Sequence, residues 1–306
     1  MLKKLTYLTL ILAGLQMFSA CSGSSNKGGK SSDDELTLSD SLASDSPLEL
    51  SEEVIGDVIQ NISSPVEMAN MIKSSGVEFS QKILNSTEQI DNYNTGYKRA
   101  LNLGVYSADL GYINTFDKNT IVVSYLVAIK SLAEGIKVGQ FFDFNSLKRI
   151  ATNSNNLDSL MEISISSFNK MDNYLRNQNR SNVSSLIVTG AWIEGLYLSA
   201  NVIEQTNNDD LITRLAEQKD IINILMIILN NYSNDQNFAE LAARIELLKS
   251  AYGGVKITTE VGEPQTIEKD GKLIIVQDEI SHVEISPEQV QKIIKEIKSL
   301  RQFVVS

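Results

Sequence analysis

ALNLGVYSADLGYINTF, residues 100–116, and VSSLIVTGAWIEGLYLSANVI, residues 183–203, are two long stretches that each contain a single charged residue. That residue is Asp109 in the first stretch and Glu194 in the second. A helix on a protein surface has a polar face, whereas a helix that is apolar or small all round is buried among other elements. We therefore predict that both stretches form central, buried helices, each with one acidic side chain.

Helical signals continue on both sides of these two stretches. Ser64-Pro65-Val66-Glu67 is a capping box with proline at the first helical position, and the apolar residues after it recur mostly at helical spacing. Short connections rich in Asn and Asp favour antiparallel packing of about eight helices into one domain. The predicted helices span residues 64–92, 95–115, 118–142, 146–153, 157–177, 182–205, 210–232 and 237–252. The predicted N-caps of five of them are Asp117, Asn145, Asn156, Ser181 and Asp209.

The pattern changes after the last of these helices. Residues 256–261 and 265–277 are rich in β-branched side chains, and Asp270-Gly271 is a hairpin-turn signal. Ser286-Pro287-Glu288-Gln289 then starts an amphipathic helix that runs to about Leu300. The predicted fold class is all-α, a single antiparallel multi-helix domain with a small C-terminal β-hairpin and a terminal helix.

Glycines inside the two central stretches indicate a close approach to the backbone. Gly104, Gly111, Gly190 and Gly195 each cost about 1 kcal/mol relative to alanine in a helix interior. Their presence predicts either close packing of two helices or a cavity lined by backbone.

Asp109 and Glu194 are the candidate site residues, because a buried carboxyl group must be paired, hydrogen-bonded or neutralised. In one interpretation both acids line a ligand-binding pocket, where two carboxyl groups in unlike surroundings could act as acid and base on a glycosidic bond. The aromatic residues of that pocket would be Tyr106, Tyr112, Trp192 and Tyr197. In the other interpretation the acids are structural, and they accept hydrogen bonds from neighbouring side chains or pair with Arg99 or Arg149.

The composition excludes several classes of site. The chain has 306 residues, a formal net charge of −11, one Cys and one His. One Cys forms neither an internal disulfide nor a Cys-based metal site, and one His excludes sites with several His ligands. The acidic balance argues against nucleic-acid binding through a basic patch. We predict no metal, no cofactor and no catalytic residue, and we expect His282 at the surface.

The N-terminus has the layout of a secretory signal. Lys3-Lys4 precedes an apolar run over residues 5–18, and Ser19-Ala20 stands directly before Cys21. The run is too short for a transmembrane helix. Phe18-Ser19-Ala20-Cys21 resembles the lipobox of bacterial lipoproteins, with Phe in place of the usual Leu. The resemblance implies that Cys21 becomes the acylated first residue and holds the protein on a bilayer.

Residues 21–60 form a second region, which we predict to be a disordered acidic tether. Residues 22–60 contain nine acidic and two basic residues among many Ser and Gly, a composition that cannot offset chain entropy. Lys30-Ser31-Ser32-Asp33-Asp34-Glu35 is similar to the signal that sends lipoproteins of Bacteroidota to the cell surface. Ser22, in place of an Asp after the Cys, favours the outer membrane. The predicted location is the outer membrane, with the cell surface favoured over the periplasmic face.

These observations predict four regions: a signal peptide (1–20), the tether (21–60), a helical domain (61–252) and a β-hairpin with a terminal helix (253–306). The chain resembles small helical outer-membrane lipoproteins of Bacteroidota, which implies contact with the bilayer through Cys21. We expect a non-enzymatic accessory subunit that binds a protein partner in an envelope assembly. The alternatives are a domain that binds a glycan or small molecule between the Asp109 and Glu194 helices, and a carboxylate-dependent glycan hydrolase.

Overall fold

The computed structural model describes residues 65–306 apart from 152–156, 263–264, 270–271 and 277–278. The predicted signal peptide, Cys21 and the acidic tether lie outside the described residues. The described chain forms two units. One is a helical unit made of residues 65–257 and 283–306, and the other is a strand unit made of residues 258–282.

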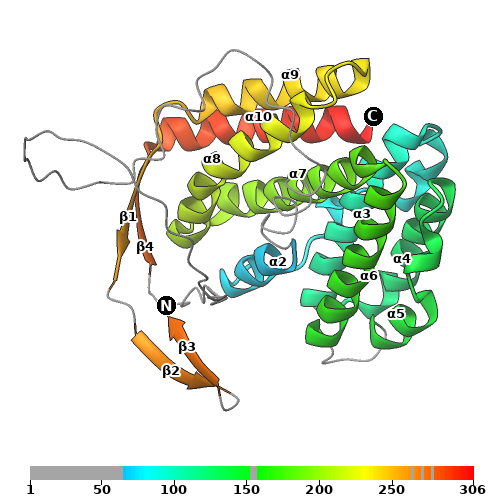
Figure 1. Cartoon of the computed structure of the whole chain (residues 1–306). Coiled ribbons are helices and arrows are strands. Elements are labelled where there is room, and N and C mark those ends of the chain that lie inside the picture. Colours follow the sequence, from blue (N-terminus) through cyan, green and yellow to red (C-terminus); the bar gives the residue numbers. More distant parts are fainter. Residues whose placement is uncertain (1–64, 152–156, 263–264, 270–271, 277–278) are drawn as a thin grey trace, which may run out of the picture. The chain divides into compact units, whose positions relative to one another are not determined.

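Nine α-helices and three short 3₁₀ helices are present within the described residues (Figure 1). The α-helices are α2 (Pro65–Ser74), α3 (Gly96–Thr115), α4 (Asn119–Gly135), α5 (Phe144–Ala151), α6 (Leu157–Asn177), α7 (Ser181–Thr206), α8 (Asp209–Asn230), α9 (Gln236–Ala251) and α10 (Pro287–Val305). The 3₁₀ helices are η1 (Gln81–Ile83), η2 (Thr87–Asn92) and η3 (Gly139–Phe141). The predicted all-α fold class is confirmed, and so is its terminal helix.

Side-chain caps explain where two of these helices begin. Thr95 Oγ1 accepts a hydrogen bond of 3.1 Å from the Lys98 amide at the start of α3. Ser286 Oγ accepts one of 3.3 Å from the Gln289 amide at the start of α10. Pro287 follows Ser286 directly, as the capping box in the sequence predicted.

Other predicted caps are wrong by one or two positions. Asp143 and Asn208 each accept a hydrogen bond from a backbone amide in the first turn of α5 and α8, respectively. Asp117 has a left-handed φ of 55° in the loop before α4, and Asn156 lies outside the described residues. The predicted caps that instead lie inside their helices are Asn145, Ser181 and Asp209.

The predicted helix over residues 64–92 is wrong beyond Ser74. Helix α2 ends there, Gly76 follows with a φ of 81°, and only the short helices η1 and η2 come before α3. A left-handed φ breaks a right-handed helix, and glycine adopts it without strain. The apolar pattern over this segment is therefore the pattern of a chain that packs on the core without forming one continuous helix.

Side chains from other helices replace the missing helical hydrogen bonds in this segment. Tyr112 Oη accepts a bond of 3.1 Å from the Ser80 amide, and Asp109 Oδ2 accepts one of 3.0 Å from the Asn85 amide. Tyr125 Oη donates to the Asn85 carbonyl oxygen at 2.9 Å. Buried backbone groups must be paired, and here α3 and α4 supply the partners.

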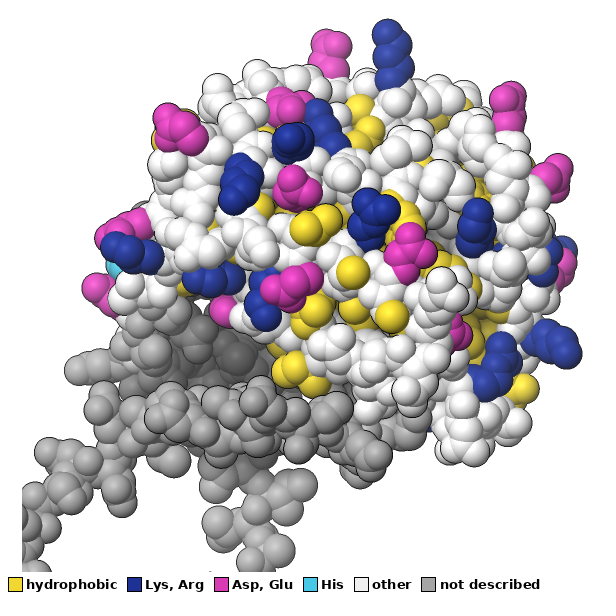
Figure 2. Space-filling view, turned by 90° about the horizontal axis from the view of Figure 1, so that it is seen from above, with side chains coloured by type: hydrophobic (Ala, Val, Ile, Leu, Met, Phe, Trp, Pro, Cys, Tyr) yellow, Lys and Arg dark blue, Asp and Glu magenta, His cyan; other side chains and the backbone are white. Residues whose placement is uncertain are grey.

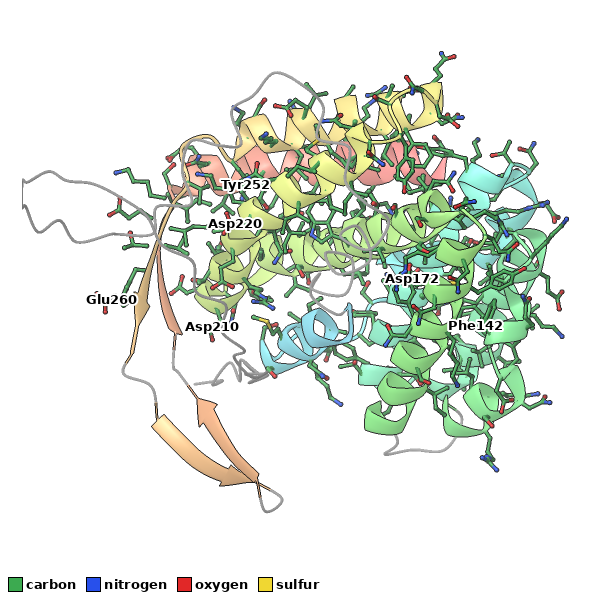
Figure 3. The ribbon with its side chains drawn as sticks, viewed as in Figure 1. Phe142, Asp172, Asp210, Asp220, Tyr252 and Glu260 are labelled. Atoms are coloured by element: carbon green, nitrogen blue, oxygen red, sulfur yellow. The ribbon has the colours of Figure 1, made fainter. Side chains whose placement is uncertain are left out.

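Helix α7 lies at the centre of the helical unit, in contact with α2, α3, α6, α8 and α10. Helix α3 also packs on α2 and α4, and α9 lies beside α10 (Figure 1). Most side chains of α3 and α7 are buried, so the two uncharged stretches are central helices, as predicted. At the end of α9, the buried hydroxyl of Tyr252 (Figure 3) donates to the Leu215 carbonyl oxygen on α8 at 2.9 Å. This bond joins two consecutive helices of the core.

Four strands lie between α9 and α10 in the sequence. They are β1 (Lys256–Val261), β2 (Gln265–Lys269), β3 (Lys272–Val276) and β4 (Glu279–Glu284). Strand β1 pairs with β4, and β2 pairs with β3 in antiparallel register with Lys269 opposite Lys272. This register leaves two residues for the turn, so the predicted hairpin is present, although Asp270 and Gly271 themselves lie outside the described residues.

Candidate functional site

Helices α3 and α7 approach each other at two glycines. A Cβ atom at Gly104 would lie 2.0 Å from the Ile187 carbonyl oxygen, and one at Gly190 would lie 2.0 Å from the Leu101 carbonyl oxygen. Contacts this short do not occur for real Cβ atoms, so neither position accepts a larger residue without a backbone shift. At Gly104 and Gly190, close packing of two helices is the one of the two predictions that the structure shows.

This packing brings Asp109 and Glu194 together. Both side chains are 0% exposed, and each lies close enough to the other to shift its pKa. Two ionised carboxylates repel each other in a buried site, which favours the protonated form of one of them. The convergence of the two acids makes them one buried site.

Arg301 on α10 is the cationic partner of this pair. Its Nε donates to Glu194 Oε2 at 3.0 Å, and its Nη2 donates to Oε1 at 3.3 Å. The guanidinium also lies over the ring of Tyr197, 4.5 Å from the centroid. A two-point contact of this kind matches the planar fork of arginine to the carboxylate, and the aromatic face covers the charge.

The sequence suggested Arg99 or Arg149 as the cationic partner of the two acids, and neither of them occupies this position. Arg99 donates to the carbonyl oxygens of Tyr93 and Gly135 at 2.9 and 3.4 Å, and Arg149 is exposed on α5. The signal that could have identified Arg301 lies in its own helix. The buried apolar residues of α10 include Ile294, Ile297 and Val304, and Arg301 continues their spacing onto the core-facing side.

Asp109 has further partners on the other side of the site. Its Oδ2 accepts the Asn85 amide hydrogen bond, and Asn85 Nδ2 donates to Tyr93 Oη at 3.0 Å. Tyr93 Oη in turn donates to the Val305 carbonyl oxygen at 3.3 Å. The network therefore joins the segment before α3, helices α3 and α7, and the end of α10.

Burial raises the pKa of both acids, but the charge and the hydrogen bonds of Arg301 oppose the shift most directly at Glu194, so the electrostatics favour the proton on Asp109. Burial raises its pKa well above the ordinary 3.8, and the charge of Glu194 raises it further, while the Asn85 amide and Arg301 oppose the shift. Asp109 Oδ1 is buried without a hydrogen-bond partner, so this oxygen is the one available to carry a proton. A neutral Asp109, an ionised Glu194 and a cationic Arg301 leave no net charge in the core.

The five residues predicted for a ligand-binding pocket differ in their surroundings. Tyr197 lies against Arg301 in the acid site. Tyr106 is fully buried and donates to the Ser86 carbonyl oxygen at 2.7 Å, and Trp192 donates from Nε1 to Gln218 Oε1 at 3.0 Å. A ligand-binding role for Asp109, Glu194, Tyr106, Trp192 and Tyr197 stays a prediction.

The chemistry of the acid site follows from its burial. Acid–base catalysis on a glycan requires both carboxyl groups within hydrogen-bond reach of the substrate. Neither Asp109 nor Glu194 has exposed surface, and their oxygens accept hydrogen bonds from Asn85 and Arg301, respectively. Through these hydrogen bonds, the acid site holds α10 against α3 and α7.

Asp172 on α6 is a second buried acid, which the sequence reasoning did not single out (Figure 3). It is 1% exposed, and Arg176 Nη2 lies 3.0 Å from its Oδ2 one helical turn later. Burial raises its pKa, and the nearby Ser184 hydroxyl and the charge of Arg176 oppose the shift. Charged residues at i and i+4 of a helix are neighbours, so this pair stabilises α6 locally.

Three further findings concern metals, membranes and surface charge. Within the described residues there is no cluster of three or more His, Cys, Asp or Glu that could hold a metal ion. The side chain of His282 is exposed, and its Nε2 lies 3.5 Å from Glu260 Oε2.

One helix of the described chain, α7, is long and apolar enough to cross a membrane, but most of it is buried as in the core helix of a soluble protein. Positive and negative side chains alternate with hydrophobic ones over the face in Figure 2.

Comparison with known proteins gives no match to a family model, to a curated protein or to a solved structure.

Proposed function

We propose that this protein is a lipid-anchored outer-membrane lipoprotein whose helical unit binds a protein partner as a non-enzymatic accessory subunit. The observation that carries the proposal is the position of Cys21, the one Cys of the chain, directly after the apolar run and two small residues. Acyl chains on this residue would supply about 0.8 kcal/mol per buried methylene, so two or more of them give stable anchoring.

The outer face of α4 supports the binding half of the proposal. Val123 and Val127 lie one turn apart and are 36% and 62% exposed. Between Thr120 and Ile129 this helix has no charged residue, so the exposed valines lie in an uncharged strip. Exposed apolar surface is stabilised when a partner covers it, and we assign this strip to a protein partner with an apolar surface of its own.

Metabolic labelling with an alkyne-modified fatty acid tests the anchor. The wild-type chain should incorporate the label and remain in the membrane fraction after a high-salt wash. The Cys21→Ser variant should lose both properties, because no other thiol is available in the chain. Equal labelling of the two chains would overturn the lipoprotein assignment.

Photo-crosslinking in intact cells tests the partner separately. A crosslinking amino acid at Val127 should give a discrete higher-mass product. The matched control is the same amino acid at Glu240, an exposed position on α9. If Val127 gives no product beyond those seen at Glu240, the α4 strip is not a binding surface, whatever the state of the anchor.

A further inference from the structure

A hollow of about 540 Å³ lies where the ends of four helices of the helical unit meet. The first turns of α3, α7 and α9 and the last turn of α4 contribute its walls. Small-molecule sites in proteins have volumes of about 300–1,000 Å³. None of the five residues predicted as a ligand site lines this hollow, so it is independent of the acid site.

The walls of the hollow are partly apolar and aromatic. Leu186 and Phe238 are each 2% exposed, and Ile136 is 4% exposed. The ring of Tyr97 lies edge-on to that of Phe238, with the centroids 6.1 Å apart. These side chains offer an apolar surface to the hydrocarbon or aromatic body of a ligand.

Two cations also line the hollow, Lys137 and Arg180. Arg180 Nη2 donates to the Ile136 carbonyl oxygen at 2.9 Å, which fixes the position of the guanidinium. The one carboxylate in the lining is that of Asp235, whose Oδ1 already accepts hydrogen bonds from the backbone and side chain of Asn237 at 2.8 and 2.9 Å. Among the ion pairs of the described residues, none involves Lys137 or Arg180.

The helix that begins at Arg180 adds positive potential. Helix α7 has no side-chain cap at its N-terminus, whereas α3 and α9 are capped by Thr95 and Asp235. Although the Val183 amide donates to Asn182 Oδ1 at 3.0 Å, the N-terminus of α7 carries the positive end of the helix dipole and favours an anion. Asn182, in that first turn, lines the hollow.

Tyr97 gives a further indication of a polar partner. Its hydroxyl oxygen is buried and has no hydrogen-bond partner within the described chain. Burial raises the pKa of this hydroxyl, and the charges of Glu240 and Asp235 raise it further, so the group remains a donor. A buried donor without an acceptor is rare in folded proteins.

We propose that this hollow binds a small organic anion, with the acidic group at Lys137, Arg180 and the start of α7 and the apolar body against Phe238 and Leu186. The Tyr97 hydroxyl is then a further hydrogen-bond donor to the ligand. The cations and the helix terminus favour a negatively charged ligand, and the aromatic wall favours a ligand with an apolar body. The site needs neither the lipid anchor nor a protein partner.

Two fluorescent dyes with the same aromatic body test the proposal. 8-Anilinonaphthalene-1-sulfonate carries an acidic group, and N-phenyl-1-naphthylamine is its uncharged counterpart. Every sample is the full-length chain with Cys21→Ser, so that no acyl chain competes for the dyes. We expect one saturable site for the sulfonate dye, with a Kd at least about tenfold below that of the neutral dye, which is the effect of one hydrogen bond to a charged group.

Matched variants locate the binding. Lys137→Gln and Arg180→Gln should each raise the Kd of the sulfonate dye about tenfold and leave the Kd of the neutral dye unchanged. Lys170→Gln, an exposed cation on α6, is the control and should change neither. The side chain of Lys137 is exposed and donates to no described group, so its variant stays informative even if loss of the Arg180 bond to Ile136 disturbs folding. Equal affinity for both dyes, or the same effect from Lys137→Gln and Lys170→Gln, would overturn the proposal.

Discussion

Arg301 donates two hydrogen bonds to the carboxylate of Glu194, across 107 residues of sequence. The glutamate side chain is 0% exposed and the arginine side chain is 12% exposed, so the ion pair is almost fully removed from water. A buried ion pair adds little net stability compared with an apolar pair, because both charges lose their hydration. Its effect is to specify the position of α10, since any other docking of that helix leaves a buried charge without a partner.

Removing one partner of this pair should be costly. Glu194→Gln leaves the guanidinium of Arg301 buried and unpaired, and we expect the free energy of unfolding to fall by about 3–5 kcal/mol. Urea titration monitored by tryptophan fluorescence measures it, because Trp192 is the one Trp of the chain and is 4% exposed. The control is Lys298→Gln on α10, which removes a partly exposed ion pair with Glu204 on α7. This variant should cost less than about 1 kcal/mol. Equal losses in the two variants would contradict a desolvated pair.

Removing both charges should restore much of that loss. In the double variant Glu194→Gln with Arg301→Met, no buried charge remains. We expect the double variant to be more stable than Glu194→Gln alone. A double-mutant cycle built from the same urea titrations measures the difference. Simple additivity of the two single losses would show that the two residues do not interact.

Asp109 should tolerate an uncharged replacement. Asn is close in shape to a protonated Asp, so Asp109→Asn should change stability at pH 7 far less than Glu194→Gln does. The folded-state pKa of Asp109 lies well above its ordinary 3.8. At a pH between the ordinary pKa and the folded-state pKa, folding is therefore accompanied by uptake of a proton. Wild-type stability should therefore fall, relative to Asp109→Asn, as the pH rises from about 4 towards the folded-state pKa. Parallel stability curves over that range would mean that Asp109 is ionised in the folded protein.

The glycines at the crossing of α3 and α7 should resist the smallest substitution. Inside a helix, Gly→Ala ordinarily stabilises by about 1 kcal/mol. At Gly104 and Gly190 the new methyl group would meet backbone oxygen at 2.0 Å, so we expect each variant to be destabilised by about 1–3 kcal/mol or more. Gly96→Ala, at the start of α3 with nothing within 4 Å of the added Cβ, is the matched control for thermal unfolding. Stabilisation of all three variants would show that the two helices can separate freely.

Local signals predicted most helices closely and failed in two segments. The helix predicted over residues 118–142 is wrong beyond Gly135, where α4 ends, because Lys137 takes a left-handed φ of 61° and only the short helix η3 follows. Helix α6 begins and ends at the predicted residues, Leu157 and Asn177, because periodicity and the short polar connections at its ends are local properties. The helix predicted over residues 64–92 stops at Ser74, before the left-handed Gly76. Beyond that point, Tyr112 and Asp109 accept hydrogen bonds from backbone amides that a continued helix would pair internally. Those two acceptors belong to α3, so nothing within the segment itself could indicate them.

The sequence by itself determined that residues 100–116 and 183–203 are buried helices and that Asp109 and Glu194 are the acids within them, because one charge among apolar residues leaves no polar face. It also determined the hairpin and the terminal helix through turn and capping residues. Only the tertiary structure decided that the two acids meet, that Arg301 is their partner, and that the helix ends at α3, α4, α7 and α9 enclose a hollow. The reason is physical: helix formation depends on hydrogen bonds four residues apart, whereas the pairing of buried charges depends on which helices pack together.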